Sequence, residues 1–410
     1  MSNSKVGIWL IGARGSIATT VMVGATAIRQ GLMEAGGMVT ATEAFVDLPL
    51  TAIADLEFGG CDIRPRTLLE SARQLQEESG CFGQGIIDRT VDALCEIDGR
   101  ISMGTTINCG ATIEDLASGS CRNDRTLLED IEKIRQHIQQ FKVDRGLDMV
   151  VVVNLASTEP LLELAECHQR LALFLNVIDR NEKALVRAST LYAYAAIREG
   201  CPYINFTPSN AALIPALVTL AQDSGVLVMG NDGKTGETLV KSALAPMFAS
   251  RNLEILSWEG FNILGNLDGK VLNDPDNCAS KLKVKDQVLE KILGYAPHSK
   301  VHINYVPSLA DQKTAWDFIH FKGFCGAKMT LQFTWQGYDS LLAAPLVLDL
   351  ARLAVLAKGR GESGLMPQLA SFFKAPLGVA EYRHAAQFEM LGKYVDKIRS
   401  SPNESDRAVG

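Results

Sequence analysis

The segment from Lys5 to Gly31 constrains the fold of this 410-residue chain more than any other. It opens with an apolar run from Val6 to Ile11, which is typical of a parallel strand buried on both faces. A tight Gly-Ala-Arg-Gly-Ser turn comes next, followed by a stretch rich in Ala, Thr and Val that predicts a helix. A strand, a glycine turn and a helix in this order begin a doubly wound α/β domain.

The glycine turn is compatible with two interpretations. Gly12 and Gly15 would let the backbone approach a phosphate, and the helix that follows offers free amides and the positive end of its dipole. However, Arg14 and Ile17 occupy the second and third glycine positions of the dinucleotide fingerprint. The segment alone therefore predicts either a dinucleotide-binding loop or an ordinary strand-to-helix turn.

A second segment repeats this order from Asp148 onward. Its apolar strand ends at Asn154, and we expect Ser157 or Thr158 to cap a following helix that carries Pro160 in its first turn.

A third segment begins at Val226 and has the glycine-rich turn 230–238, which contains Asp232 and Lys234. Each turn by itself is explained as a simple loop between strand and helix. Three polar turns at the carboxyl ends of apolar strands instead indicate one shared crevice.

Composition excludes several classes of protein. Lys and Arg number 40 and Asp and Glu number 47, and without a basic run we expect no nucleic-acid partner. The wholly apolar runs are far shorter than the roughly 20 residues of a membrane span, and we expect neither a secretory signal nor a membrane partner. Nine cysteines without a C-x-x-C pair argue against a disulfide framework or a zinc ribbon and predict a cytoplasmic protein.

The texture of the sequence changes after about residue 240. The runs 301–308, 315–324 and 328–335 are strand-like with partial period-two alternation, which predicts a second domain on a largely antiparallel or mixed sheet with one covered face. From Ser340 the pattern returns to an apolar helix, in which Asp349 and Arg352 are expected on a polar stripe. The polar tail that follows residue 399 is expected to be disordered.

Lysines are the first candidates for chemistry in this second domain. Lys281 and Lys285 are four residues apart and share a face if the segment is helical, whereas Lys283 does not. Two ammonium groups on one face would lower each other's pKa, which can leave one of them as a base, but a solvated basic face is the more common explanation of such a pattern. Lys313 precedes an expected strand. Lys374 lies between aromatic residues and a proline, where it is either partly desolvated or extended to solvent.

Four carboxylates occupy turn positions: Asp232, Asp268, Asp311 and Asp339. An Asx turn explains each one by itself. Spacing alone does not assemble these lysines and carboxylates into one site, so the residues by themselves indicate a nicotinamide-type α/β enzyme with a lysine-rich second domain.

These same residues resemble the myo-inositol-phosphate synthase family, in its shorter prokaryotic branch. The matching blocks keep their order over nearly the whole chain: YINFTPSN, GNDGKTGETLVKS, GFNILGNLDG, SKLKVK, ADQK and YDSLLAAPLVLDL. The resemblance implies a Rossmann-type NAD-binding domain at 1–234 and 335–410. An inserted α+β catalytic and tetramerisation domain would span 235–334, and the protein would be a homotetramer.

The resemblance also implies the reaction. The family converts D-glucose 6-phosphate to 1D-myo-inositol 3-phosphate by NAD-dependent oxidation at C5, enolisation, intramolecular aldol cyclisation and re-reduction, without net redox change. Two alternatives are an NAD-dependent polyol or sugar-phosphate dehydrogenase, and a catalytically silent NAD-binding protein. The four matching lysines argue against the silent protein.

Site residues follow from the same match. Catalytic roles are implied for Lys281, Lys285, Lys313, Lys374 and Asp232. Cofactor contacts are implied for Gly12, Gly15, Ser16, Asp62, Ser157, Thr158, Asp232, Asp268, Asp311, Asp339 and Ser340. Contacts to the substrate phosphate are implied for Thr235, Gly236, Asn266, Lys285 and Lys313.

Three positions depart from the eukaryotic branch. The first loop reads Gly-Ala-Arg-Gly-Ser instead of an asparagine-rich glycine loop, and Leu267 replaces a second Asn. The phosphate-binding Ser-Gly-Gln reads Thr-Gly-Glu, ending in Glu237. This carboxylate would repel the phosphate unless it turns away, meets a lysine, or binds a bridging divalent or monovalent cation.

Overall fold

The computed structural model describes residues 5–117, 119–121, 124–272, 277 and 287–400. Its larger sheet has seven parallel strands in the order β11-β6-β5-β4-β1-β2-β3. Strands β1 to β6 have the order of the doubly wound dinucleotide-binding fold, and β11 is added at the β6 edge. The predicted Rossmann-type α/β class is therefore confirmed. The strands are β1 Val6–Ile11, β2 Leu56–Asp62, β3 Ile101–Met103, β4 Met149–Asn154, β5 Tyr203–Asn205, β6 Leu227–Gly230 and β11 Gly364–Leu365.

Helices cover both faces of this sheet, and β1 shows why its sequence is apolar throughout. Val6, Ile8 and Leu10 lie in a core shared with helices α1 and α14, whereas Trp9 and Ile11 lie in the core shared with α5 and α8. The α-helices are α1 Ser16–Arg29, α2 Leu68–Ser79, α3 Ile86–Asp98, α4 Ala111–Glu114, α5 Leu127–Arg145, α6 Glu166–Gln169, α7 Leu171–Asp179, α8 Ala188–Arg198, α9 Pro215–Asp223, α10 Gly236–Ser250, α11 Leu267–Leu272, α13 Gln287–Leu293, α14 Asp339–Gly359 and α15 His384–Ser400.

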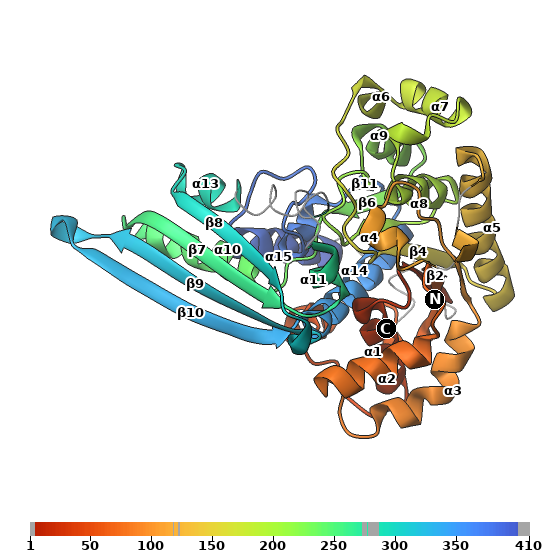
Figure 1. Ribbon diagram of the computed structural model, residues 1–410, viewed down its shortest axis with the longest axis horizontal. Coiled ribbons are helices and arrows are strands. Elements are labelled where there is room, and N and C mark those ends of the chain that lie inside the picture. Colours follow the sequence, from red (N-terminus) through yellow and green to blue (C-terminus); the bar gives the residue numbers. More distant parts are fainter. Residues whose placement is uncertain (1–4, 118, 122–123, 273–276, 278–286, 401–410) are drawn as a thin grey trace.

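A second sheet extends away from the first, toward the left in Figure 1. It contains β7 Glu254–Leu264, β8 His298–Tyr305, β9 Gln312–Lys322 and β10 Lys328–Tyr338, in the order β10-β9-β7-β8. Strands β7 and β8 are parallel and the other pairs antiparallel, so the predicted mixed sheet is confirmed. Lys313 lies inside β9, not before it.

One face of the mixed sheet is covered by α10 and α13. Phe248 of α10 and Leu289 of α13 form a small core with Trp258 and Ile319 from the strands. On the other face Phe261 stacks on His302 and on Trp316, and Trp316 is exposed. The alternation of the strand sequences therefore corresponds to one covered and one open face, as expected.

The helix expected after Ser157 or Thr158 is not formed, and this prediction was wrong. The chain from residue 155 to 165 is irregular, and α6 begins only at Glu166. Side chains from a distant segment bind the backbone here: Ser209 accepts from the Glu159 amide, and Asn210 both accepts from and donates to the Leu162 backbone. These bonds replace those that a helix would supply.

The polar stripe expected on the helix after Ser340 was also wrong. Asp349 is fully buried and accepts hydrogen bonds from the amides of Val39 and Thr40, while Arg352 donates to the carbonyl of Thr51. Helix α14 is long and apolar enough to cross a membrane, but 67% of its most apolar window is buried, and it packs on α1 and β4. The two charged residues therefore fasten a loop to a core helix.

Several predictions fall outside the described residues, namely those on Lys281, Lys283, Lys285 and the tail beyond residue 400. The proposed insertion at 235–334 remains a prediction. Helix α10 starts next to its first boundary, and β10 continues past its second boundary to Tyr338.

Candidate active site

A cavity of about 210 Å³ lies at the carboxyl ends of the parallel strands, next to the point where the strand order reverses between β1 and β4. It is large enough for an organic ligand, not only for a water molecule. Residues predicted to contact cofactor or substrate line it together: Gly12, Gly15, Ser16, Asp62, Ser157, Thr158, Asp232, Thr235, Asn266, Asp268, Asp311, Asp339, Ser340 and Lys374. The three polar turns of the sequence thus share one crevice.

The glycine turn after β1 forms one wall. Gly12 has φ +77°, and a Cβ there would lie 3.0 Å from the Cα of Ala156 in the loop after β4. A side chain at this position would therefore be strained and would close the gap between the two loops. Helix α1 begins at Ser16, and Gly15, Ser16 and Ile17 line the cavity, so the N-terminus of the helix lies beside it, as phosphate binding requires.

Asp62 ends β2 beside this turn and is almost fully buried. Its carboxylate accepts the amides of Arg14 at 2.7 Å and Arg64 at 2.9 Å. The guanidinium of Arg14 turns away and pairs with Asp98 at 3.0 Å. The arginine at the second glycine position thus leaves the turn intact and ties it to α3.

Asp232 and Lys374 form a buried ion pair at the far end of the cavity. Their Oδ1 and Nζ atoms are 2.8 Å apart, and both side chains are at most 10% exposed. The Lys374 amide also donates to the Asp232 carbonyl at 2.7 Å, beside a bridge between Gly233 and Phe373. The pair is therefore fixed by main-chain bonds between the turn after β6 and the segment before α15.

Asp311 and Ser340 meet at the junction of the two sheets. The Asp311 carboxylate accepts from the Ser340 hydroxyl and, at 3.1 Å, from the amide nitrogen of Asn266. Burial, opposed by these hydrogen bonds and aided by the negative Asp339, raises the pKa of Asp311 to about 6.

Asp339 bridges both parts of the molecule. It accepts from Lys313 of β9 at 3.3 Å and from Thr235 at 3.3 Å. Lys313 and Gly236 line a smaller cavity that shares Asp339 with the main one. The N-terminus of α10 and an ammonium group therefore lie together, which suits a phosphate.

A chain of amide side chains under the cavity was not predicted from the sequence. Asn154 donates to Asn205 at 3.1 Å, and Asn205 donates to Asn231 at 2.7 Å. These bonds connect the carboxyl ends of β4, β5 and β6. A signal was present, because each of the three strands ends in or next to an asparagine.

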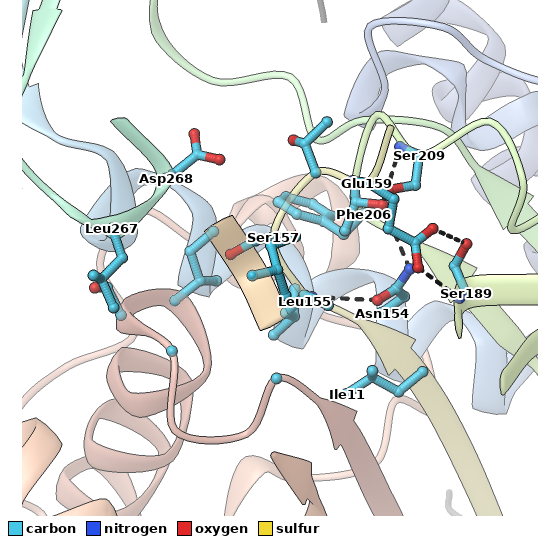
Figure 2. A pocket seen from close by; sticks show the side chains of 18 of the residues that line it. Ile11, Asn154, Leu155, Ser157, Glu159, Ser189, Phe206, Ser209, Leu267 and Asp268 are labelled. Carbon is cyan, nitrogen blue, oxygen red and sulfur yellow. Dashed lines mark hydrogen bonds between the residues drawn. The ribbon is translucent and has the colours of Figure 1, made fainter. Parts of the chain in front are cut away.

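Glu159 was missed as well. Figure 2 shows its carboxylate directed at Ser189, whose amide donates to it at 2.8 Å. Burial raises the pKa of Glu159 to about 7, although hydrogen bonds from Ser189 oppose the shift. No sequence pattern distinguishes this residue from a surface glutamate.

Lys234, in the turn after β6, carries a buried ammonium near Lys374. It donates to Gln387 of α15, and burial together with the nearby positive charge of Lys374 lowers its pKa to about 8. At neutral pH it therefore still adds positive charge to this end of the cavity. Within the described ranges, no group of three or more His, Cys, Asp or Glu side chains is arranged to hold a metal ion.

Comparisons with known proteins lead to inositol-phosphate synthases and a related protein. The profile of the family described as myo-inositol-1-phosphate synthase matches residues 6–395. An inositol-3-phosphate synthase of Bacteroides thetaiotaomicron is 32% identical, over 96% of this chain and 94% of its own length. The crystal structure of inositol-3-phosphate synthase from Caenorhabditis elegans superposes with a TM-score of 0.86 at 28% identity, covering 99% of this chain and 88% of that one. A myo-inositol-1-phosphate synthase-related protein from Thermotoga maritima gives a TM-score of 0.78 at 25% identity, covering 95% and 98%.

Proposed function

The chain belongs to the myo-inositol-1-phosphate synthase family, and from this premise we propose that it converts D-glucose 6-phosphate to 1D-myo-inositol 3-phosphate with NAD. The observation that carries this proposal is the grouping of two lysine–carboxylate pairs with a glycine turn around two cavities that share Asp339. Lys374 pairs with Asp232 and Lys313 with Asp339. An ordinary nicotinamide enzyme needs the glycine turn but not two ammonium groups at its other end.

The cofactor end of the cavity fits NAD. Gly12 leaves open a space that a Cβ would narrow, the N-terminus of α1 faces it, and Asp62 supplies a carboxylate at the end of β2. In the proposed assignment, Gly12, Gly15 and Ser16 hold the pyrophosphate, and Asp62 accepts the ribose hydroxyls. Bound NAD supplies a hydride acceptor for C5 and the return of that hydride.

The lysines stabilise the oxygens that become negative in turn. In the proposed assignment, Lys374 lies near C5, where its ammonium stabilises the ketone oxygen as the proton at C6 leaves. Asp232 holds that ammonium in place through the 2.8 Å pair. Preorganised charges of this kind act without reorganisation in a cavity that excludes water. Lys281, outside the described residues, is assigned to the same proton transfers.

The phosphate and the C1 oxygen lie at the other end in this assignment. Thr235 and Gly236 offer the first amides of α10, and Lys313 adds a positive charge. Lys285, also outside the described residues, is assigned here. Holding C1 against C6 turns the aldol step into an intramolecular reaction, which lowers its entropic cost.

We further propose a cytoplasmic homotetramer. The open face of the mixed sheet carries the stacked rings of Phe261 and His302, 4.5 Å apart, and the exposed Trp316. Aromatic side chains of this kind are enriched in protein interfaces. The expected solution mass is four times the 44.4 kDa of one chain, measured by sedimentation equilibrium.

The function is tested with glucose 6-phosphate and NAD far below the substrate concentration. Phosphorus and proton NMR should show that inositol phosphate forms over many turnovers, and no NADH should accumulate. When the substrate carries deuterium at C5, the product should retain it. Stoichiometric NADH and a keto or acid product would instead establish a dehydrogenase. NAD binding without any turnover would establish the silent protein.

A further inference from the structure

Glu237 is the residue that the family pattern does not explain. It lies in the first turn of α10, directly after the proposed phosphate contacts Thr235 and Gly236. It also lines the smaller cavity with Lys313 and Asp339. A carboxylate here offsets the positive end of the helix dipole, which would otherwise attract a phosphate.

The structure places this carboxylate against a lysine of its own helix. Glu237 Oε1 lies 2.6 Å from the Nζ of Lys241, one turn later, and both side chains are at most 3% exposed. Asn262 of β7 donates to Glu237 Oε2 at 2.6 Å. The charge is thus neutralised and hydrogen-bonded inside the protein, between α10 and the covered face of the mixed sheet.

Gly260 of β7 leaves the space that the Glu237 carboxylate occupies. A Cβ on Gly260 would lie 2.5 Å from Glu237 Oε1 and 3.3 Å from Asp317 Oδ1. Asp317 also accepts from the indole of Trp258, and the Lys241 ammonium lies 5.7 Å from the centre of that ring. Two buried carboxylates, Glu237 and Asp317, therefore lie close to the Lys241 ammonium. Without this positive charge they would be buried without a counter-charge, which is energetically costly.

We propose that Lys241 is a positioning residue that serves as the built-in counter-cation of the phosphate loop. It holds the Glu237 carboxylate within α10 and away from the ligand, so that glucose 6-phosphate binds without an added divalent ion. This inference rests on the proposed function, because it takes glucose 6-phosphate as the ligand. It selects the lysine among the three outcomes that the sequence left open for Glu237.

The test is a double-mutant cycle read out by substrate affinity. In K241M the Glu237 charge loses its partner, and we expect the KM for glucose 6-phosphate to rise at least about tenfold, as for other buried charge pairs, with NAD affinity unchanged. In E237Q/K241M neither charge is present, and KM should return to within about threefold of wild type. EDTA should leave the wild-type KM unchanged.

The matched control is the pair Glu389–Lys393 on α15. It has the same i, i+4 spacing at 2.8 Å, but both side chains are more than 60% exposed. E389Q, K393M and the double variant should leave KM unchanged, because exposed pairs contribute little. Should K241M fail to fold, E237Q/K241M carries the test: wild-type-like KM supports the inference, and a tenfold increase overturns it.

A second readout separates this inference from the function itself. Glucose 6-phosphate should raise the melting temperature of the NAD-bound wild type and of E237Q/K241M, but raise it less for K241M. If the three proteins show this pattern of melting temperatures but the wild type forms no inositol phosphate, the proposed function fails and the inference stands. If product forms while KM in K241M is unchanged, or if EDTA abolishes wild-type binding and Mg²⁺ restores it, the inference is overturned.

Discussion

The parallel sheet carries its polar side chains at one edge, whereas the mixed sheet buries charged side chains in its covered face. At the parallel edge, Asp62, Asn154 and Asn205 end strands β2, β4 and β5, and the first two of them line the cavity. In the mixed sheet, Asp317 points inward from β9 toward Glu237 and Lys241 of α10.

The difference follows from how each sheet is covered. Helices pack on both faces of the parallel sheet, which leaves the strand ends as the place for polar groups. The mixed sheet is covered on one face only, and its charges are stabilised by pairing across that face. The cavities lie where the two arrangements meet, and four measurements test the comparison.

The largest effect is expected for the lysines that the two parts bring to one centre. Lys374→Met removes the ammonium from the parallel-sheet side, and Lys313→Met removes one from the mixed-sheet side. Each should lower kcat about 10²–10³-fold, because each loses one preorganised charge, while the protein still folds and binds NAD. Lys374→Met should also lower the melting temperature, because it leaves Asp232 buried without its partner. Steady-state kinetics on both variants check this, and wild-type turnover in both would contradict a shared centre.

The same series extends to the lysines outside the described residues. Lys281→Met and Lys285→Met should match the loss of Lys374→Met. Lys283→Met serves as the control, since in a helix it points away from the other two. Equal damage from Lys283→Met would show that the sequence pattern assigns the wrong residues.

Next in size is a pH effect at the parallel edge. The pKa of Glu159 is raised to about 7, so the native state keeps a proton that the unfolded chain loses near pH 4.5. Stability should therefore fall as pH rises from about 4.5 to 7, by up to about 3 kcal/mol. Glu159→Gln should remove this slope in urea unfolding at pH 5 and pH 8. An unchanged slope would exclude Glu159 as its source.

A smaller effect is expected on the open face of the mixed sheet. Trp316→Glu should raise the dissociation constant of the proposed tetramer at least about tenfold, because it would place a charge within an apolar contact. Phe388→Glu on α15 is the control, since Phe388 is similarly exposed but lies outside this sheet. Sedimentation equilibrium of both variants gives the answer, and dissociation by Phe388→Glu alone would move the interface to α15.

The smallest effect concerns Asp311 at the junction. Its pKa is raised to about 6, and the ionised carboxylate is the stronger acceptor for the hydrogen bonds from Ser340 and Asn266. We expect kcat/KM to fall as pH decreases through about 6 and the Asp311→Asn variant to lack this limb. A limb that persists in the variant would assign the titration to another group.

Local patterns were sufficient for much of this molecule. The apolar run at 6–11 coincides with β1, and the alternation at 328–335 falls within β10. Partners far apart in sequence were not accessible in this way. Lys374 and Asp232 are 142 residues apart, and only the packing of the segment before α15 on the turn after β6 brings them together.

The strands at 6–11, before Asn154 and after Val226 and the glycine turn could be predicted from the sequence, because they depend on residue types at short, regular spacing. The family resemblance was also readable there, because its blocks keep their order along the chain. Tertiary structure alone decided that Asp349 is buried, that no helix follows Thr158, and that Glu237 meets Lys241. The physical reason is the same in each case. A polar group adopts the partner that the folded chain places next to it, since leaving it buried without one costs more free energy than a local preference provides.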